Sequence, residues 1–134
     1  MEVTEYGHGV SVGVDDGGFV TGLKQHRPIR VTKPLDKASV NLSQAMVDRE
    51  KLNRVTIDFV RPGPGGGEEN YYRIELLNAY IVNISHSSQT RLPPDWEVIT
   101  APMLETLTLT YQKIIWTWVG EGRSSEDDWI TPGN

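Results

Sequence analysis

Two alternating apolar segments, joined by a glycine-rich stretch, constrain the fold of this 134-residue chain more than any other feature. In residues 54–61 the apolar side chains fall at every second position, and these are Val55, Ile57 and Phe59. A period of two places alternate side chains on opposite faces of a β-strand. Residues 62–67, Pro-Gly-Pro-Gly-Gly-Gly, end this strand, and residues 71–85 resume the alternation. The pattern predicts an antiparallel β-hairpin.

One helix is predicted, at about residues 40–51. Ser39 precedes it and is a favourable N-cap, because its hydroxyl can accept a hydrogen bond from a free amide of the first turn. Apolar residues then recur at helical spacing, and these are Leu42, Ala45 and Met46. A short strand at Ile29–Lys33 comes before the helix, and Asp36, Lys37, Ala38 and Ser39 form the turn that opens it.

The remaining segments are strands and loops. One or two short strands are expected within residues 1–14, followed by a turn at Asp15–Gly18 and a polar loop to Gln25. A long polar loop is expected at residues 85–102. We therefore predict a mainly β fold, a small antiparallel β-barrel or sandwich with one flanking α-helix. The length favours a single domain over residues 1–134, with an acidic C-terminal tail at 120–134.

Two of the predicted strands are apolar on both faces. The strand that begins at Tyr71 and the segment Leu104–Val119 each carry an apolar set that changes face partway along. Either a bulge switches the phase of the strand, or both faces are buried and the outer one meets another subunit. The sequence leaves both alternatives open. Under the second, the subunit-facing side chains include Leu77, Ala79, Ile81, Trp116 and Trp118.

Catalytic and metal-binding patterns are not found. The chain has no cysteine, and its three histidines (His8, His26 and His86) lie in different segments without ligand spacing. The paired carboxylates Asp15–Asp16 and Glu68–Glu69 adjoin glycine turns, where they are solvated and poor general acids. We therefore predict no enzymatic activity, no catalytic residue, no metal and no cofactor.

Charge and hydropathy argue against two classes of partner. The net charge of −5 disfavours nucleic-acid and anionic-membrane binding. No apolar stretch is long enough to cross a bilayer, and the N-terminal residues are too polar for a cleavable signal peptide. The tryptophans and tyrosines are expected in core and interface packing. One alternative function remains, a monomeric β-barrel binding module or effector-like secreted protein that uses an aromatic surface.

Several segments, in order and spacing, resemble the Hcp family of the bacterial type VI secretion system. His26-Arg27-Pro28-Ile29 with Val31-Thr32-Lys33 is similar to the family's strand before its helix. Asp36-Lys37-Ala38-Ser39 is the most specific match. Further matches follow along the chain, at Val55–Asp58, Tyr71–Leu76, Leu107–Tyr111, Lys113–Thr117 and Asp127–Trp129. The chain departs from the family at Val40, where proline is usual, and at Arg49, where glycine is frequent. It also lacks the strand that family members carry before the segment matching Glu2.

The resemblance implies a structural role. Family members assemble into hexameric rings that stack into a tube, inside a contractile sheath and behind a spike protein, and can carry effectors. The resemblance also implies residence in the bacterial cytoplasm until firing, then secretion without a cleavable signal. It places ring-to-ring contacts on the loop from Val14 to Gln25, at Asp15, Asp16, Gly17, Gly18 and Phe19. It implies that Asp36–Ser39 sets how the helix leaves the barrel wall.

Overall fold

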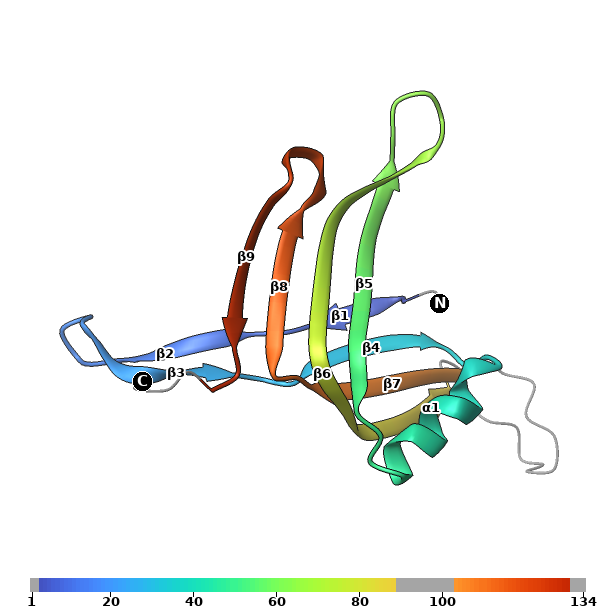
Figure 1. The fold of residues 1–134 in the computed structure, drawn as a ribbon, viewed down its shortest axis with the longest axis horizontal. Helices are drawn as coiled ribbons and strands as arrows, with labels where there is room; N and C mark the ends of the chain where they lie inside the picture. Colours follow the sequence, from blue (N-terminus) through green and yellow to red (C-terminus); the bar gives the residue numbers. More distant parts are fainter. Residues whose placement is uncertain (1–2, 89–102, 131–134) are drawn as a thin grey trace. The chain divides into compact units, whose positions relative to one another are not determined.

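The computed structural model describes residues 3–88 and 103–130 and is mainly β. Within these residues the chain forms nine strands, one α-helix and a short 3₁₀-helix (Figure 1). In chain order they are β1 (Glu5–Gly7), β2 (Val10–Val14), β3 (Val20–His26), β4 (Ile29–Pro34), α1 (Ala38–Val47), β5 (Leu52–Pro62), β6 (Glu68–Ser88), β7 (Met103–Thr110), β8 (Lys113–Trp118), η1 (Val119–Glu121) and β9 (Arg123–Asp128). All strand pairs are antiparallel among those with a determined register.

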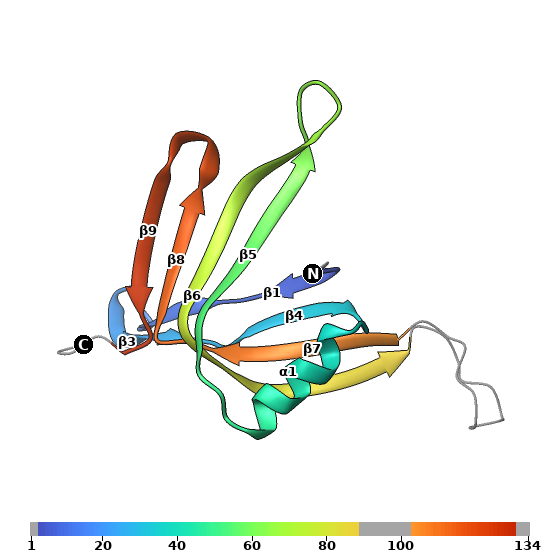
Figure 2. The same ribbon diagram turned by 45° about the vertical axis from the view of Figure 1, so that its right-hand side comes forward.

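The chain divides into two compact units that share strand β6. The helix unit comprises Met1–Ser11, His26–Glu50 and Tyr80–Thr110. Its strands pair in the order β1-β4-β7-β6, using the second half of β6. The hairpin unit comprises Val12–Gln25, Lys51–Ala79 and Tyr111–Asn134. There the first half of β6 lies between β5 and β8, and β9 pairs with β8 (Figures 1 and 2). The prediction of one domain over residues 1–134 stays a prediction.

The predicted fold class is confirmed, and so are the main strands. β5 and β6 form the expected hairpin, closed by a turn in which Gly65 and Gly66 have positive φ angles of 87° and 89°. In β4, Ile29, Val31 and Lys33 are buried while their neighbours point outward, as the alternation indicated. The buried apolar residues of the helix unit are Ile29, Val31, Ala45, Ile81, Leu107 and Leu109. Those of the hairpin unit are Ile57, Ile74, Leu76, Ala79, Tyr111 and Ile114.

Strand β6 changes its buried face through two irregularities. Ile74 and Leu76 are buried before Asn78, whose φ of 52° lies in the left-handed region that asparagine tolerates. Ala79 and Ile81 are buried after it, and a bulge shifts the register with β7 between Ile81 and Asn83. The bulge alternative of the sequence analysis is therefore the correct one for β6.

The segment Leu104–Val119 is interrupted rather than buried on both faces. β7 ends at Thr110 and β8 begins at Lys113, so the change of phase occurs at a corner. Gln112 donates its backbone N–H to the Leu77 carbonyl across this corner, at 3.0 Å. Two-sided burial is not needed to explain either segment, and it no longer supports an interface.

A buried polar cluster holds helix α1 against the sheet of the helix unit. Lys33 of β4 and Glu105 of β7 are directly paired in register, and both are fully buried. The Lys33 Nζ lies 3.0 Å from Glu105 Oε2 and 3.0 Å from Asp36 Oδ1. Ser39 Oγ, from the first turn of α1, donates to Glu105 Oε2 at 2.8 Å. These bonds join two strands to the helix.

The predicted start of the helix is wrong, and the same cluster gives the reason. α1 spans residues 38–47 rather than 40–51, and Leu52 already belongs to β5. Ser39 is inside the helix and is not its N-cap, because its hydroxyl is used by Glu105 and Lys33. The capping bond comes from Asp36, whose Oδ1 accepts the backbone N–H of Ala38 at 3.0 Å. The match to the family at 36–39 thus coincides with a polar anchor for the helix.

Charges in the cluster stabilise one another despite burial. Burial alone would raise the pKa of Glu105, but hydrogen bonds from Lys33, Ser39 and His86 outweigh it and the pKa falls below its ordinary value. Burial would likewise lower the pKa of Lys33, but the bonds to Asp36 and Glu105 raise it. Both groups are therefore ionised at neutral pH.

Helix α1 ends in a Schellman motif with an unfavourable residue at its key position. The Glu50 N–H bonds to the Ala45 carbonyl at 2.9 Å and the Arg49 N–H bonds to the Met46 carbonyl at 3.1 Å. This pattern puts Arg49 at the C′ position, with a φ of 55° that favours glycine. The family's frequent glycine at this position now has a conformational reason.

We expect Arg49→Gly to raise the free energy of unfolding by about 0.5–1 kcal/mol, because glycine adopts positive φ without steric cost. Urea unfolding followed by circular dichroism measures the change. Asp48→Gly is the matched control, since Asp48 has an ordinary φ of −82° and glycine there should destabilise the protein. A loss of stability in Arg49→Gly would contradict the proposed strain.

We expect Glu105→Leu to lower the free energy of unfolding by about 3–5 kcal/mol, because it leaves the Lys33 ammonium buried without its carboxylate. The double variant Lys33→Met/Glu105→Leu should recover much of that loss. Since the pKa of Glu105 is lowered in the folded state, its contribution is present at neutral pH and is lost as the pH falls through that pKa. The free energies of unfolding of the wild type and of Glu105→Gln should therefore converge as the pH is lowered from 7 to 3. An undiminished difference at acid pH would count against the ion pair.

Candidate functional site

The predicted loop from Val14 to Gln25 is instead a β-hairpin. β2 and β3 pair only with each other among the described residues, and Asp15–Gly18 forms the turn that the sequence indicated. Asp15 Oδ1 accepts the backbone N–H groups of Gly17 at 3.0 Å and Phe19 at 2.9 Å. Gly18 has a φ of 86°, and the Asp15 N–H bonds to the Phe19 carbonyl. The turn is therefore ordered, because the Asp15 carboxylate accepts hydrogen bonds from two of its backbone amides.

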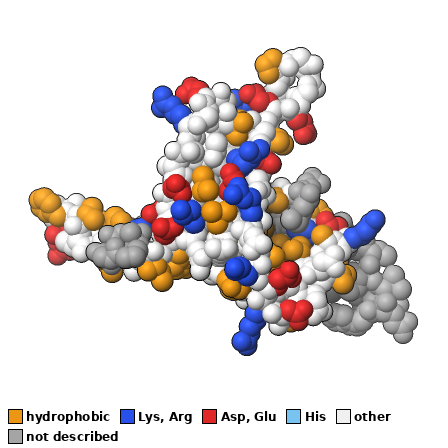
Figure 3. Space-filling model, in the orientation of Figure 1, with side chains coloured by type: hydrophobic (Ala, Val, Ile, Leu, Met, Phe, Trp, Pro, Cys, Tyr) orange, Lys and Arg blue, Asp and Glu red, His pale blue; other side chains and the backbone are white. Residues whose placement is uncertain are grey.

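The hairpin exposes apolar side chains that an isolated soluble surface would seldom display. Phe19 is 72% exposed and Val20 is 66% exposed. Further apolar side chains follow along both strands, and these are Val12, Val14 and Leu23. Figure 3 shows this hydrophobic surface on the hairpin, at the left of the view. Several exposed apolar side chains gathered on one element are typical of a protein–protein contact.

Two glycines bring the strands of the hairpin close together. A Cβ added to Gly13 would lie 2.8 Å from the Gly22 Cα, and one added to Gly22 would lie 2.7 Å from the Gly13 Cα. No other residue type fits at either position without moving the backbone. The hairpin is also tethered to β9, because Lys24 Nζ lies 2.6 Å from Asp127 Oδ1. Sequence reasoning missed both features.

The residues predicted to face another subunit are divided by the structure. Ala79 is fully buried and Ile81 is 6% exposed, so the chain itself covers them. Leu77 and Trp116 are half-buried, and Trp118 is 41% exposed. Within this set only Leu77, Trp116 and Trp118 have surface that a second chain could contact.

Trp118 belongs to an ordered aromatic cluster in the hairpin unit. Its ring lies edge-on to Tyr71, with 6.0 Å between ring centroids. The Arg61 guanidinium lies over the Tyr71 ring at 4.8 Å and within 5.8 Å of the Trp118 ring centroid. Cation–π and edge contacts of this kind hold aromatic side chains in fixed positions at the surface.

The predicted C-terminal tail contains a strand. Residues 123–128 form β9 along the whole of β8. Trp129 then packs edge-on against buried Tyr111 at 4.9 Å, and its N–H donates to the Gln112 carbonyl at 2.8 Å. Trp129 thus packs within the chain, in line with the packing role expected for the tryptophans. The predicted loop at 85–102 differs as well, since β6 runs to Ser88, and its residues 89–102 lie outside the described ones.

Across residues 3–88 and 103–130, no group of three or more His, Asp or Glu side chains converges as a metal site would require. No helix in this part of the chain has the length and hydropathy to cross a membrane. The β2–β3 hairpin and the aromatic cluster are therefore the candidate surfaces for function.

Comparison with known proteins agrees with these features. Residues 1–118 match the family described as type VI secretion system effector, Hcp. The chain is 36% identical over 131 residues to the "Major exported protein" of Pseudomonas aeruginosa, covering 97% of this chain and 75% of that protein. It superposes on a crystal structure of an Hcp protein with a TM-score of 0.81 and 29% identity, over 95% of this chain and 76% of the other. The secreted protein Hcp3 of Pseudomonas aeruginosa gives a TM-score of 0.72 and 32% identity, over 96% and 75%. This chain belongs to the Hcp family of the type VI secretion system.

Proposed function

We propose that this chain is a structural subunit of the secretion tube, assembling into hexameric rings that stack end to end. A hexameric ring closes when one surface of each subunit contacts a complementary surface of the next subunit. Stacked rings then multiply each modest contact along the tube. The contractile sheath and the spike protein are the further partners, and effector proteins are carried as cargo.

The exposed β2–β3 hairpin is the observation that carries this proposal. It presents apolar side chains on a turn ordered by Asp15 and on strands held close by Gly13 and Gly22. A pre-ordered contact loses little conformational entropy on binding. The hairpin, with Asp15, Asp16, Gly17, Gly18 and Phe19 at its turn, is therefore the proposed contact between rings.

The aromatic cluster is the proposed contact between neighbours in one ring. Aromatic and arginine side chains are enriched at interface hot spots. Trp118, Tyr71 and Arg61 combine these types in a fixed arrangement. Ile81 is unsuitable as a probe of this interface, because it is 6% exposed and a charge there would disturb the fold.

Export follows from the same proposal. The "Major exported protein" of Pseudomonas aeruginosa and the secreted Hcp3 are relatives of this chain. By that relationship the chain resides in the bacterial cytoplasm before firing and leaves with the tube, without a cleavable signal peptide. It performs no catalysis and acts through assembly.

One alternative has an observation in its favour. The same Trp118 cluster could serve a monomeric binding module or a secreted effector-like protein, since one exposed aromatic platform suits a ligand as well as a subunit. Native mass spectrometry separates the two. A hexamer supports the tube subunit, and a stable monomer at micromolar concentration favours the binding module.

We expect Val20→Asp to abolish ring stacking while hexamers persist, because it puts a charge into the apolar contact surface of the hairpin. Val40→Asp is the matched control, since Val40 is 74% exposed on helix α1 and Val20 is 66% exposed. Negative-stain electron microscopy measures tube length, and native mass measures the hexamer. Tubes of normal length in Val20→Asp would exclude the hairpin from the ring-to-ring contact.

We expect Trp118→Ala to weaken the hexamer by at least about tenfold in dissociation constant, as loss of a hot-spot aromatic does. Tyr80→Ala is the control, because Tyr80 is also a surface aromatic, 37% exposed. Light scattering over a dilution series reports the oligomeric state. If the Trp118→Ala and Tyr80→Ala hexamers both dissociate at the same protein concentration as the wild-type hexamer, the aromatic cluster is not the lateral interface.

A further inference from the structure

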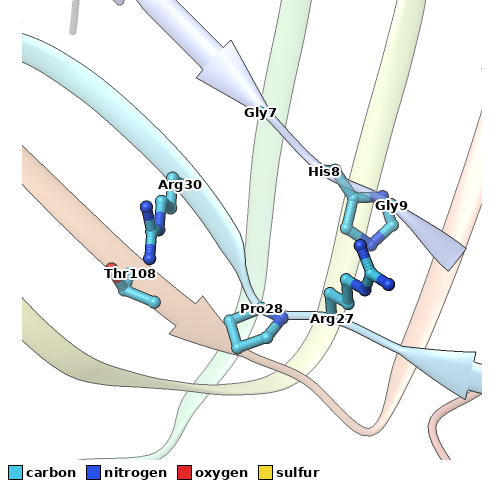
Figure 4. Close-up of a pocket in the computed structure, with 7 residues that line it drawn as sticks. All are labelled: Gly7, His8, Gly9, Arg27, Pro28, Arg30 and Thr108. Carbon is cyan, nitrogen blue, oxygen red and sulfur yellow. The ribbon is translucent and has the colours of Figure 1, made fainter.

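The β2–β3 hairpin forms a sheet of its own, so strand pairing does not fix the direction in which it projects. β2 and β3 pair only with each other in residues 3–88 and 103–130. At the base of the hairpin the Arg27 N–H donates to the Gly9 carbonyl at 3.1 Å, and Figure 4 shows these two residues next to each other. This bond holds the two ends of the hairpin together. A different contact has to hold the hairpin against the rest of its unit.

Lys24 is the residue of the hairpin that makes such a contact. Its side chain is 17% exposed, although β3 is exposed at every position from Val20 to Leu23. Lys24 is also the one lysine or arginine in residues 10–25. Its Nζ lies 2.6 Å from the Asp127 Oδ1 of β9, and the two residues are 103 positions apart in the sequence. The hairpin therefore uses its one cation to bind a distant strand of the same unit.

Asp127 points to the opposite face of β9 from its acidic neighbours. It is paired in register with the fully buried Ile114, and residues paired across two strands share a face. Glu126 points to the other face, where the Lys113 Nζ lies 3.0 Å from its Oε2. The Asp127 carboxylate therefore lies on the side of the sheet that carries the apolar core. Lys24 supplies a positive charge to it there.

Strand β9 is a firm support for the hairpin. It pairs with β8 along its whole length. Directly after it, the Trp129 N–H donates to the Gln112 carbonyl at 2.8 Å, and the Trp129 ring packs edge-on against the buried Tyr111. The Asp127 side chain is 31% exposed, so water and salt screen the ion pair less than a pair in open solvent. The contact is thus shielded and rests on an element that is held at its end.

We propose that the Lys24–Asp127 ion pair is a positioning contact, which fixes the direction in which the β2–β3 hairpin projects. The Asp15 turn and the Gly13–Gly22 approach give the hairpin its shape, and both are local. The ion pair gives it a direction, because it joins β3 to a strand far away in the sequence. Its consequence for ring stacking rests on the proposed function. Every hairpin of a ring must point the same way to contact the next ring.

The test measures the direction of the hairpin by double electron–electron resonance. Spin labels are attached to Asp16→Cys at the hairpin tip and to Ser124→Cys on β9, and one labelled chain is diluted into each assembly. The chain has no native cysteine, and both positions are exposed. Lys24→Met should broaden the distribution of distances by about twofold or more, because methionine keeps the hydrocarbon chain and loses the charge.

Lys113→Met is the matched control, since it removes a lysine from an ion pair with Glu126 of the same strand, on the face away from the hairpin. It should leave the distribution unchanged. The charge-swapped variant Lys24→Asp/Asp127→Lys should restore the narrow distribution, which a loss of packing alone would not allow. An unchanged distribution in Lys24→Met, or equal broadening in Lys113→Met, would overturn the positioning role. Circular dichroism checks that each variant is folded.

Tube length separates this inference from the proposed function. Lys24→Met hexamers should form shorter tubes than the wild type, and the charge-swapped variant should recover the length. Wild-type hexamers that form no tubes would contradict the proposed function, while the spin-label distances would still decide the role of the ion pair. A broadened distribution with tubes of normal length would support the positioning contact and exclude the hairpin from ring stacking.

Discussion

The ion pair between Lys33 and Glu105 is the interaction on which the helix unit depends. Two opposite charges with no exposed surface are costly to remove from water, and only close, fully hydrogen-bonded geometry repays that cost. Here Lys33 Nζ has four oxygen acceptors within 3.1 Å for its three N–H donors. Glu105 meets Lys33 and Ser39 through one oxygen and His86 through the other, at 3.2 Å. A helix in any other position would leave one of these charges without partners. The cluster thus specifies where α1 lies, beyond what its few apolar side chains could specify.

In the hairpin unit, the β2–β3 hairpin is held in shape by local interactions and not by a buried polar cluster. This hairpin has little buried surface and owes its shape to local devices, the Asp15 turn and the Gly13–Gly22 approach. Local order lets the exposed side chains be apolar without collapse into a core. A subunit that must contact others in a regular assembly needs such a surface to exist before contact is made. The aromatic cluster around Trp118 serves the same need through cation–π and edge contacts.

Much of the fold followed from local pattern, and the errors have physical causes. The β5–β6 hairpin was predictable because alternation and a glycine-rich turn agree with each other. The change of buried face at Asn78 could not be chosen over two-sided burial, since a residue type alone does not report its φ angle. The loop predicted after Asp15 was wrong because β3 has only two apolar residues, Val20 and Leu23, and their spacing does not alternate, so the sequence offers no strand pattern to detect. Ser39 was assigned as a cap because its better partner, Glu105, lies 66 residues further along the chain.

The sequence by itself determined the class of the protein: a β-rich chain without catalytic or metal-ligand patterns, with segments in the order typical of the Hcp family. Those properties are local, and the order of the segments can be recognised in the sequence without knowing which residues are in contact. Only the tertiary structure decided which residues are available for function. It buried Ala79 and Ile81, left Trp118 and Phe19 exposed, and set Lys33 beside Glu105 in the core. Exposure and juxtaposition depend on strand register, which is settled by pairings between residues far apart in the chain.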